Sequence, residues 1–219
     1  MYMADSSKQF SVMASLMVIF FIMLGSILPA GAEPDTTETK QMTGKCICST
    51  SLIDHKPDIA EIKKLAEQGD PDAQRNLGLK YEKGNGLPQD DIQAVVWYRK
   101  AAEQGDTKAQ WFLGSMYDDG KGVTQEDKQA LFWYGKAAEQ GSLNAQLRLG
   151  EIFAEGHAVS QNDVVAYAWY SLAITQGDEI ASRKRGIISS KFTPEQLNQA
   201  QTLAIELQTK IDKHKKCNL

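Results

Sequence analysis

The chain repeats itself every 36 residues, and this period constrains its fold more than any other feature of the sequence. The tetrapeptide Ala-Glu-Gln-Gly begins at Ala66, at Ala102 and at Ala138. A Trp-Tyr pair recurs at the same interval, at residues 97–98, 133–134 and 169–170. A fixed period of about 20 to 50 residues is typical of stacked repeat arrays, in which neighbouring units bury a continuous core. The sequence therefore predicts such an array, which presents a surface for holding another molecule.

Each repeat is predicted to fold as two antiparallel helices. In every copy a residue that can cap a helix precedes the first helix and a glycine ends it: Asp70 and Gly84, Asp106 and Gly120, and Ser142 and Gly156. Before the second helix, Thr124-x-x-Asp127 and Ser160-x-x-Asp163 resemble a capping box. The predicted fold class is all-α, an α-solenoid of helix-turn-helix repeats of period 36 with capping helices at both ends.

A glycine also recurs inside the first helix of each repeat, at residues 78, 114 and 150. Glycine in a helix costs about 1 kcal/mol relative to alanine, so its recurrence indicates that a neighbouring helix comes close at this position. The Trp of each Trp-Tyr pair is expected in the core. After the third copy, Thr193-Pro194-Glu195-Gln196 predicts the start of an amphipathic helix that shields the open end of the array.

The predicted domain organisation places a targeting segment and a linker before the repeats. Residues 1–32 are predicted to be a signal peptide or an N-terminal membrane anchor, and residues 33–56 a flexible polar linker. The units that follow are an N-terminal capping helix at 57–69, repeats at 70–105, 106–141 and 142–177, a degenerate repeat with a C-terminal capping helix at 178–211, and a basic tail at 212–219.

The N-terminal segment predicts export. Residues 12–28 are uncharged and mostly apolar, and Ala30-Gly31-Ala32 closes them with the small-x-small pattern that a signal peptidase accepts. Cleavage after Ala32 gives a periplasmic or secreted protein, whereas an uncleaved segment anchors the chain to the inner membrane by residues 12–28. Export permits disulfides: Cys46 with Cys48, in a very tight ring, or either of them with Cys217, and the sequence does not decide whether any of these bridges forms.

Signals for chemistry are few. The net charge of −4 argues against nucleic-acid binding, which usually requires a clustered basic face. The three histidines, His55, His157 and His214, are scattered, and Cys46-x-Cys48 lacks the second ligand pair of a metal site. No Ser/His/Asp grouping, phosphate loop or nucleotide fingerprint is present. We therefore expect no catalytic residue, no cofactor and no metal, and the recurring Glu67, Glu103 and Glu139 are interpreted as structural or solvated.

The repeat pattern resembles a known family. It is A-E-Q-G-D-x-x-A-Q-x-x-L-G-x-x-Y, a Gly-x-Gly loop, then Q-D-x-x-x-A-x-x-W-Y-x-x-A, over residues 58–211. This is similar to the Sel-one-like repeat (SLR) family, which is related to the tetratricopeptide repeat. The resemblance implies an all-helical superhelix with a concave face and an adaptor function, in the bacterial envelope or at a host interface. The Helicobacter branch with β-lactamase activity has a cysteine pair in each repeat, which this chain lacks.

A binding surface is predicted from positions that vary among the copies but share one side of the first helix. Such positions are not fixed by packing and are open to selection by a ligand. By the resemblance to tetratricopeptide arrays they form the concave face: Asp72, Arg75, Leu79, Glu82, Lys108, Trp111, Ser115, Asp118, Asn144, Leu147 and Glu151. Trp111 is either an exposed binding hot spot or a residue that packs on the next repeat. Phe112 is expected to face a neighbouring helix.

The sequence thus predicts an exported, non-enzymatic scaffold that binds a protein or peptide in its concave groove. Nucleic acid is not an expected partner, and membrane contact is expected only through an uncleaved N-terminal segment. Two alternatives remain: a hydrolase of the β-lactamase or penicillin-binding type, and a protein associated with the cell wall.

Overall fold

A computed structural model describes residues 58–156 and 159–217. Every regular element in this part of the chain is an α-helix: α2 (Ile59–Glu67), α3 (Pro71–Lys83), α4 (Asp91–Glu103), α5 (Thr107–Asp119), α6 (Asp127–Glu139), α7 (Leu143–Glu155), α8 (Asp163–Thr175), α9 (Glu179–Ser189) and α10 (Pro194–Cys217). The predicted signal segment and linker, Cys46, Cys48, His55 and His157 lie outside the described residues. Residues 58–217 belong to one compact unit.

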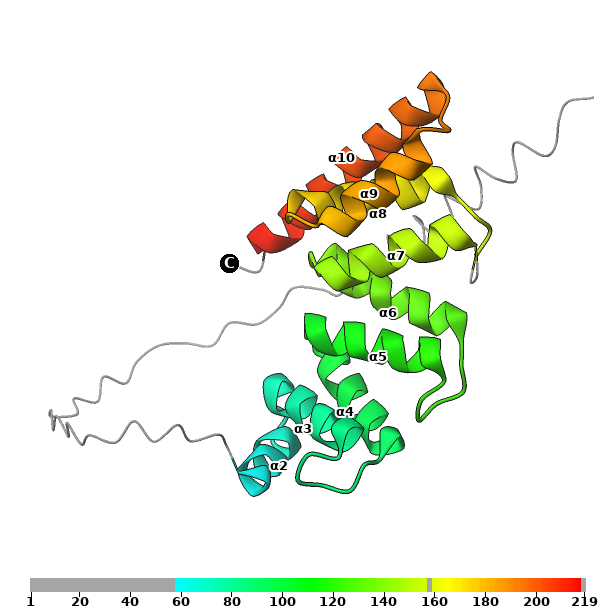
Figure 1. The fold of residues 1–219 in the computed structure, drawn as a ribbon. Helices are drawn as coiled ribbons and strands as arrows, with labels where there is room; N and C mark the ends of the chain where they lie inside the picture. Colours follow the sequence, from blue (N-terminus) through cyan, green and yellow to red (C-terminus); the bar gives the residue numbers. More distant parts are fainter. Residues whose placement is uncertain (1–57, 157–158, 218–219) are drawn as a thin grey trace, which may run out of the picture. The chain divides into compact units, whose positions relative to one another are not determined.

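The helices form an α-solenoid, as predicted. Helices α3 and α4, α5 and α6, and α7 and α8 pair as hairpins, and each hairpin packs on the helix before and after it in the chain. Figure 1 shows this stack from α2 to α9. We call α3, α5, α7 and α9 the A helices, and α4, α6 and α8 the B helices. The A helices carry the predicted binding stripe.

Helix boundaries agree with the predicted N-caps for the A helices but not for the B helices. Asp70 and Asp106 each accept a hydrogen bond from a backbone N–H of the first turn, at 2.8 and 2.7 Å, whereas Ser142 makes no such side-chain bond. The predicted capping boxes at Thr124 and Ser160 are wrong, because α6 and α8 begin two residues later, after Glu126 and after Asn162.

The loop backbone explains why the B helices begin later than predicted. In each hairpin, the residue just before the B helix donates its N–H to an aromatic residue near the end of the A helix: Asp90 to Tyr81, Glu126 to Tyr117, and Asn162 to Phe153. These bonds, of 2.8 to 3.1 Å, fix the point at which the chain turns into the B helix. The cap position therefore follows the hairpin geometry rather than the Ser/Thr pattern.

The recurring glycines inside the A helices are packing sites, as predicted. A Cβ atom added to Gly114 would lie 2.7 Å from the ring of Tyr134, and the same clash recurs between Gly78 and Tyr98 and between Gly150 and Tyr170. These tyrosines are almost completely buried. Glycine at this position thus lets the tyrosine of the B helix lie directly against the A-helix backbone.

A buried glutamine joins each of the helices α3, α5 and α7 to the helix before it. Gln110 is 3% exposed; its Nε2 donates to the carbonyl of Ala102 at 3.1 Å, and its Oε1 accepts from Gln140 at 2.7 Å. The same pair of bonds recurs one repeat earlier at Gln74 and one repeat later at Gln146. Because a buried amide is costly unless it is bonded, this ladder fixes the register of adjacent repeats.

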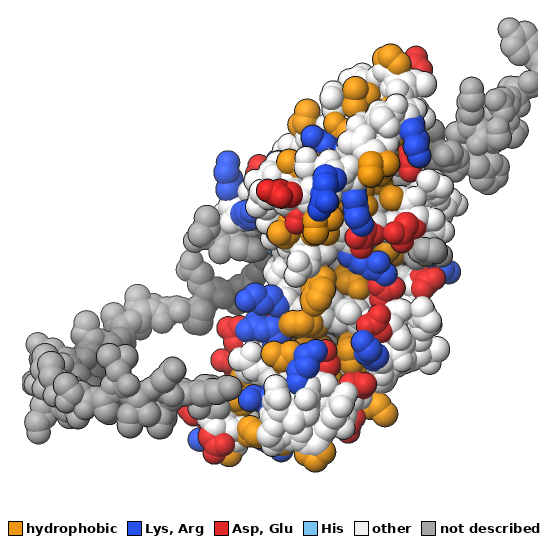
Figure 2. All heavy atoms as spheres, viewed as in Figure 1, with side chains coloured by type: hydrophobic (Ala, Val, Ile, Leu, Met, Phe, Trp, Pro, Cys, Tyr) orange, Lys and Arg blue, Asp and Glu red, His pale blue; other side chains and the backbone are white. Residues whose placement is uncertain are grey.

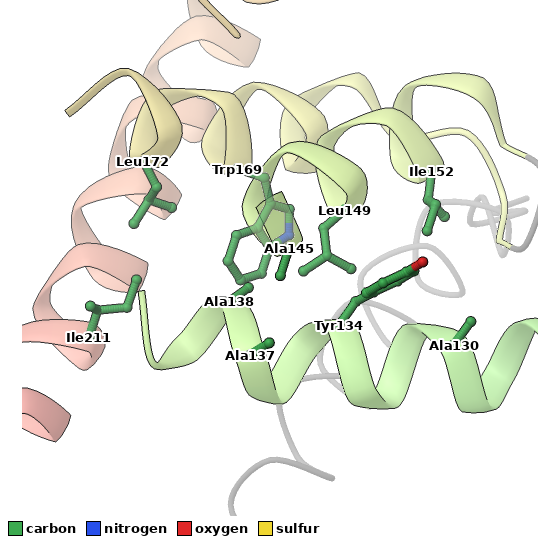
Figure 3. Close-up of a cluster of buried hydrophobic side chains, with 10 residues drawn as sticks. All are labelled: Ala130, Tyr134, Ala137, Ala138, Ala145, Leu149, Ile152, Trp169, Leu172 and Ile211. Atoms are coloured by element: carbon green, nitrogen blue, oxygen red, sulfur yellow. The ribbon is translucent and has the colours of Figure 1, made fainter. Parts of the chain in front are cut away.

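The core runs along the stack as a series of clusters between successive hairpins. Trp133 and Trp169, each 8% exposed, pack with residues of the preceding repeat, whereas Trp97 at the first copy is only partly buried. Figure 3 shows the cluster around Tyr134 and Trp169, which also contains Ile211 of α10. The expectation that the recurring tryptophans are core residues is therefore confirmed for two of them and in part for Trp97.

Helix α10 does not complete a fourth hairpin with α9. It packs chiefly on α8 and reaches the end of α6. A reciprocal capping box starts it, because Thr193 Oγ1 accepts from the N–H of Gln196 and Gln196 Oε1 accepts from the N–H of Thr193. On α8 the outward positions Ala168 and Leu172 are apolar and buried. The predicted capping helix therefore covers the outer side of the last full repeat.

Candidate functional site

The predicted binding stripe lies on the A helices, and a hollow opens between α5 and α7. The hollow has a volume of about 430 Å³. Six residues of the predicted stripe line it: Trp111, Ser115, Asp118, Asn144, Leu147 and Glu151. The other five lie on α3, at residues 72, 75, 79 and 82, and at Lys108 near the start of α5, and none of these lines the hollow.

Trp111 packs on the next repeat, one of the two alternatives that the sequence left open, and it also lines the hollow. Its side chain is partly buried and packs against the hydrophobic cluster of the next repeat. It also stands edge-on to Phe112, with ring centroids 5.1 Å apart, and lines the hollow. Phe112 stacks on Tyr98 of α4 at 5.0 Å, which confirms that it faces a neighbouring helix. The indole is thus held in place by the core while part of it remains accessible.

Apolar and polar groups alternate across the hollow. Leu147, which occupies the position of Trp111 one repeat later, is half-buried. Ser115 supplies a hydroxyl group and Asn144 an amide group. A hollow that combines apolar surface with a few placed polar groups is the usual form of a ligand-binding site. Figure 2 shows hydrophobic side chains interspersed with acidic and basic ones on one face of the molecule, without dominance of either charge.

An ion-pair network crosses the hollow and joins the A helices. Arg148 Nη2 lies 2.7 Å from Asp118 Oδ2, and Arg148 Nη1 lies 3.4 Å from Glu151 Oε2. Glu151 also pairs with Lys184 of α9. Burial alone lowers the pKa of the Arg148 guanidinium, but the hydrogen bond and charge of Asp118 outweigh it and raise this pKa above its ordinary value. The guanidinium therefore remains charged and tied to both carboxylates.

Tyr134 closes the floor of the hollow. Its hydroxyl donates to Asp118 Oδ2 at 3.2 Å. Burial, the negative charge of Asp118 and this hydrogen bond all raise the pKa of the phenol. One repeat earlier, Tyr98 donates to Glu82 at 2.6 Å, and burial and the same kind of bond raise its pKa as well. Both phenols are therefore neutral donors rather than bases.

Several predicted ligand-contacting residues are engaged within the chain. Arg75 pairs with Asp72 at 2.7 Å and also with Asp106 at the N-terminus of α5. Glu82 and Asp118 accept bonds from the tyrosines of the B helices. At these positions the residue type therefore varies because adjacent hairpins are linked in different ways.

Sequence reasoning missed three residues that line the hollow: Asp119, Tyr134 and Arg148. Tyr134 belongs to a Trp-Tyr pair and is buried in the core, but it also lines the hollow. The stripe also continues onto α9, where Ile180 and Ile187 are 49% and 64% exposed. Extending the 36-residue register by one more copy, from Asn144 and Glu151, would have found these two residues.

No group of three or more His, Cys, Asp or Glu side chains in residues 58–156 and 159–217 is placed to hold a metal ion. In the same part of the chain, no helix is both long and apolar enough to cross a membrane. What the hollow offers is an aromatic surface, a leucine and fixed polar groups.

Comparisons with known proteins agree with the repeat register. The family model described as the Sel1 repeat matches three times, at residues 71–106, 107–142 and 143–178. A Sel1 repeat protein from Oxalobacter formigenes is 38% identical, and the match covers 58% of this chain and 96% of that one, with a TM-score of 0.54. The chain belongs to the Sel1 repeat family. Among curated proteins, none matches significantly.

Two further solved structures resemble this Sel1 repeat protein. One is a protective antigen of uropathogenic Escherichia coli strains that displays an SLR fold, at 32% identity over 72% of this chain and 43% of that one, with a TM-score of 0.45. The other is Helicobacter pylori cysteine rich protein B, at 24% identity over 58% of this chain and 97% of that one, with a TM-score of 0.46. The Sel1 fold is that of a protein-interaction scaffold, and proteins of this family are typically non-catalytic.

Proposed function

We propose that this Sel1 repeat protein is an exported scaffold that holds a protein or peptide partner against its A helices. The observation that carries the proposal is the hollow between α5 and α7, in which Trp111 and Leu147 remain accessible on a rigid helical frame. Tryptophan is enriched among the residues that dominate binding energy, because it buries a large apolar area. The partner would insert an apolar side chain between Trp111 and Leu147.

The rest of the face would position the partner rather than attract it by charge. Asp118, Glu151 and Arg148 are already paired with one another, and Asp119 pairs with Lys121 at 2.8 Å. Because these charges are already neutralised, they attract a partner only weakly over long distances. Their remaining lone pairs and N–H groups can still form hydrogen bonds with the partner's backbone. Binding of this kind depends on shape and changes little with salt.

We place this activity in the bacterial cell envelope, in the periplasm or outside the cell, or at a host interface. The support is the uncharged segment at residues 12–28 followed by Ala30-Gly31-Ala32. Retention of that segment would anchor the scaffold to the inner membrane instead. The scaffold is non-enzymatic in this proposal, since burial and the charge of Asp118 keep the phenol of Tyr134 a neutral donor rather than a base.

The test is recovery of partners from an envelope extract on immobilised wild-type protein and on Trp111→Ala. The matched control is Ile205→Ala, because Ile205 is 68% exposed on α10, away from the A helices. We expect a protein that wild type and Ile205→Ala retain and Trp111→Ala loses at least tenfold, with unchanged circular dichroism. Equal retention by all three would refute the site.

Two further assays separate this proposal from its alternatives. Sedimentation with purified cell wall that does not depend on Trp111 would assign the protein to wall association. Turnover of a chromogenic β-lactam by the purified protein would assign it to the hydrolase class.

A further inference from the structure

The B helices carry a second, unfilled surface, and α10 shows what kind of element it accepts. Helix α10 lies on the outward side of α8 and extends to the end of α6. There, Leu172 of α8 and Ile211 of α10 belong to one buried cluster, as Figure 3 shows. Ala168, one turn before Leu172, is fully buried. A B helix of this protein therefore already binds an amphipathic helix on its outer side.

The same outward positions on α4 and α6 are exposed. Val96 and Phe132 occupy the position of Ala168 and are 39% and 51% exposed, and Ile92, one turn before Val96, is 64% exposed. Phe132 is also held in place, since it stands edge-on to Trp133 with ring centroids 5.0 Å apart. We call Ile92, Val96 and Phe132, with the lysines described below, the B-helix patch.

The C-terminal ends of α6 and α4 show the same difference between a covered and an exposed position. Where α10 crosses the end of α6, a Cβ atom on Gly141 would lie 3.3 Å from Lys215. Glu139 is largely buried there, and burial raises the pKa of its carboxyl although Lys210 and His214 of α10 lower it. The equivalent Gly105 on α4 has no atom within 4 Å of such a Cβ, and Glu103 is exposed. The position that α10 fills on α6 is thus open on α4.

The charge of the B-helix patch specifies a partner different from α10. Lys100 and Lys136 stand where α8 has Leu172, and Lys128 stands where it has Val164. Lys100 lies over the ring of Trp97 at 4.0 Å, and Lys136 over that of Phe132 at 5.1 Å. None of the three makes an ion pair with any residue that the structure describes. This contrasts with the A helices, where the carboxylates of the hollow are paired.

We propose that the outer side of α4 and α6 binds an acidic amphipathic helix of a partner protein. Its apolar stripe would cover Val96 and Phe132, as α10 covers Ala168, with a small residue opposite the larger Phe132 ring. Carboxylates flanking that stripe would pair with Lys100, Lys128 and Lys136. An amphipathic helix that lays its apolar face into a groove is a recurrent mode of recognition. The C-terminal end of α10 is basic, with Lys213, Lys215 and Lys216, so the partner helix differs from α10 in charge.

The probe is a synthetic peptide with the sequence of residues 194–217 in which its four lysines are glutamate and Cys217 is serine. The control peptide keeps the lysines. Both are titrated into the full chain and into Phe132→Ser, Lys136→Glu and Ile205→Ser, the last of which removes an exposed apolar side chain outside the patch. We expect saturable binding of the acidic peptide, at least tenfold weaker for Phe132→Ser and Lys136→Glu, unchanged for Ile205→Ser, and at least tenfold weaker for the control peptide.

Hydrogen exchange reports where the peptide binds. The proposal requires added protection in α4 and α6 and unchanged protection in α10. Absence of binding, equal affinity of the two peptides, or release of α10 would each overturn it. A dimer of the full chain that Phe132→Ser abolishes would overturn it as well, because a second copy would then cover the patch. Trp111→Ala should not alter peptide affinity, so failure of this proposal and failure of the A-helix site are distinguishable.

Discussion

Replacing Gly114 by alanine tests whether the close contact between A and B helices holds each repeat together. The new methyl group would lie 2.7 Å from Cδ1 and 2.8 Å from Cε1 of Tyr134, which is 3% exposed and bonded to Asp118. Overpacking a tight core by one methyl group costs about 1–3 kcal/mol, and the higher helix propensity of alanine returns about 1 kcal/mol. We expect a net loss of up to about 2 kcal/mol.

Gly135→Ala is the matched control. Gly135 also lies inside a helix, α6, but no atom lies within 4 Å of an added Cβ, so the propensity gain of up to about 1 kcal/mol remains. Because the propensity gain is common to both variants, they should differ by the overpacking cost of about 1–3 kcal/mol, or about 2–12 °C in melting temperature for a domain of this size. Thermal unfolding followed by circular dichroism measures the difference. Stabilisation by both substitutions would refute the close-contact argument.

Two further predictions concern the buried polar groups. Gln110→Leu removes two hydrogen bonds of about 1 kcal/mol each, so it should lower the free energy of unfolding, measured in urea, by about 1–2 kcal/mol. The control Gln201→Leu, at an exposed position, should change this free energy by less than about 0.5 kcal/mol. Burial beneath α10 raises the pKa of Glu139 above 4.5 despite Lys210, Lys136 and His214, so its ionisation destabilises the fold as pH rises through the raised value. Glu139→Gln should therefore stabilise the protein at pH 7 but not below pH 4.5, and a constant difference across this range would contradict the assignment.

The repetitive part of the fold was predictable because each local signal recurs three times. The 36-residue period and the glycines that end the A helices predicted the hairpins. The glycines inside the A helices predicted the close approach of a neighbouring helix. The position of α10 was not predicted, although a signal for it exists. Ala168 and Leu172 replace the Phe132 and Lys136 of the preceding repeat, and this local switch to apolar outward residues marks where a covering helix binds.

The candidate site was predicted only in part, and the reason is physical. Comparing repeats identified the side of the A helices on which Trp111 and Leu147 lie. It did not show that Arg148, 30 residues after Asp118, would tie that carboxylate down, because an ion pair between adjacent hairpins depends on their packing angle. Variable positions thus include both surface for a partner and links between repeats, and spacing alone does not separate the two.

Site-specific photo-crosslinking in living cells tests the central claim most directly. A photoreactive amino acid replaces Asn144, which is exposed and lines the hollow, or Gln201, which is exposed on α10. We predict a discrete covalent adduct with one partner from position 144 that is absent from position 201 and disappears when Trp111→Ala is added. No adduct at position 144, or the same adducts at both positions irrespective of Trp111, would contradict the assignment of the A-helix hollow as the binding site.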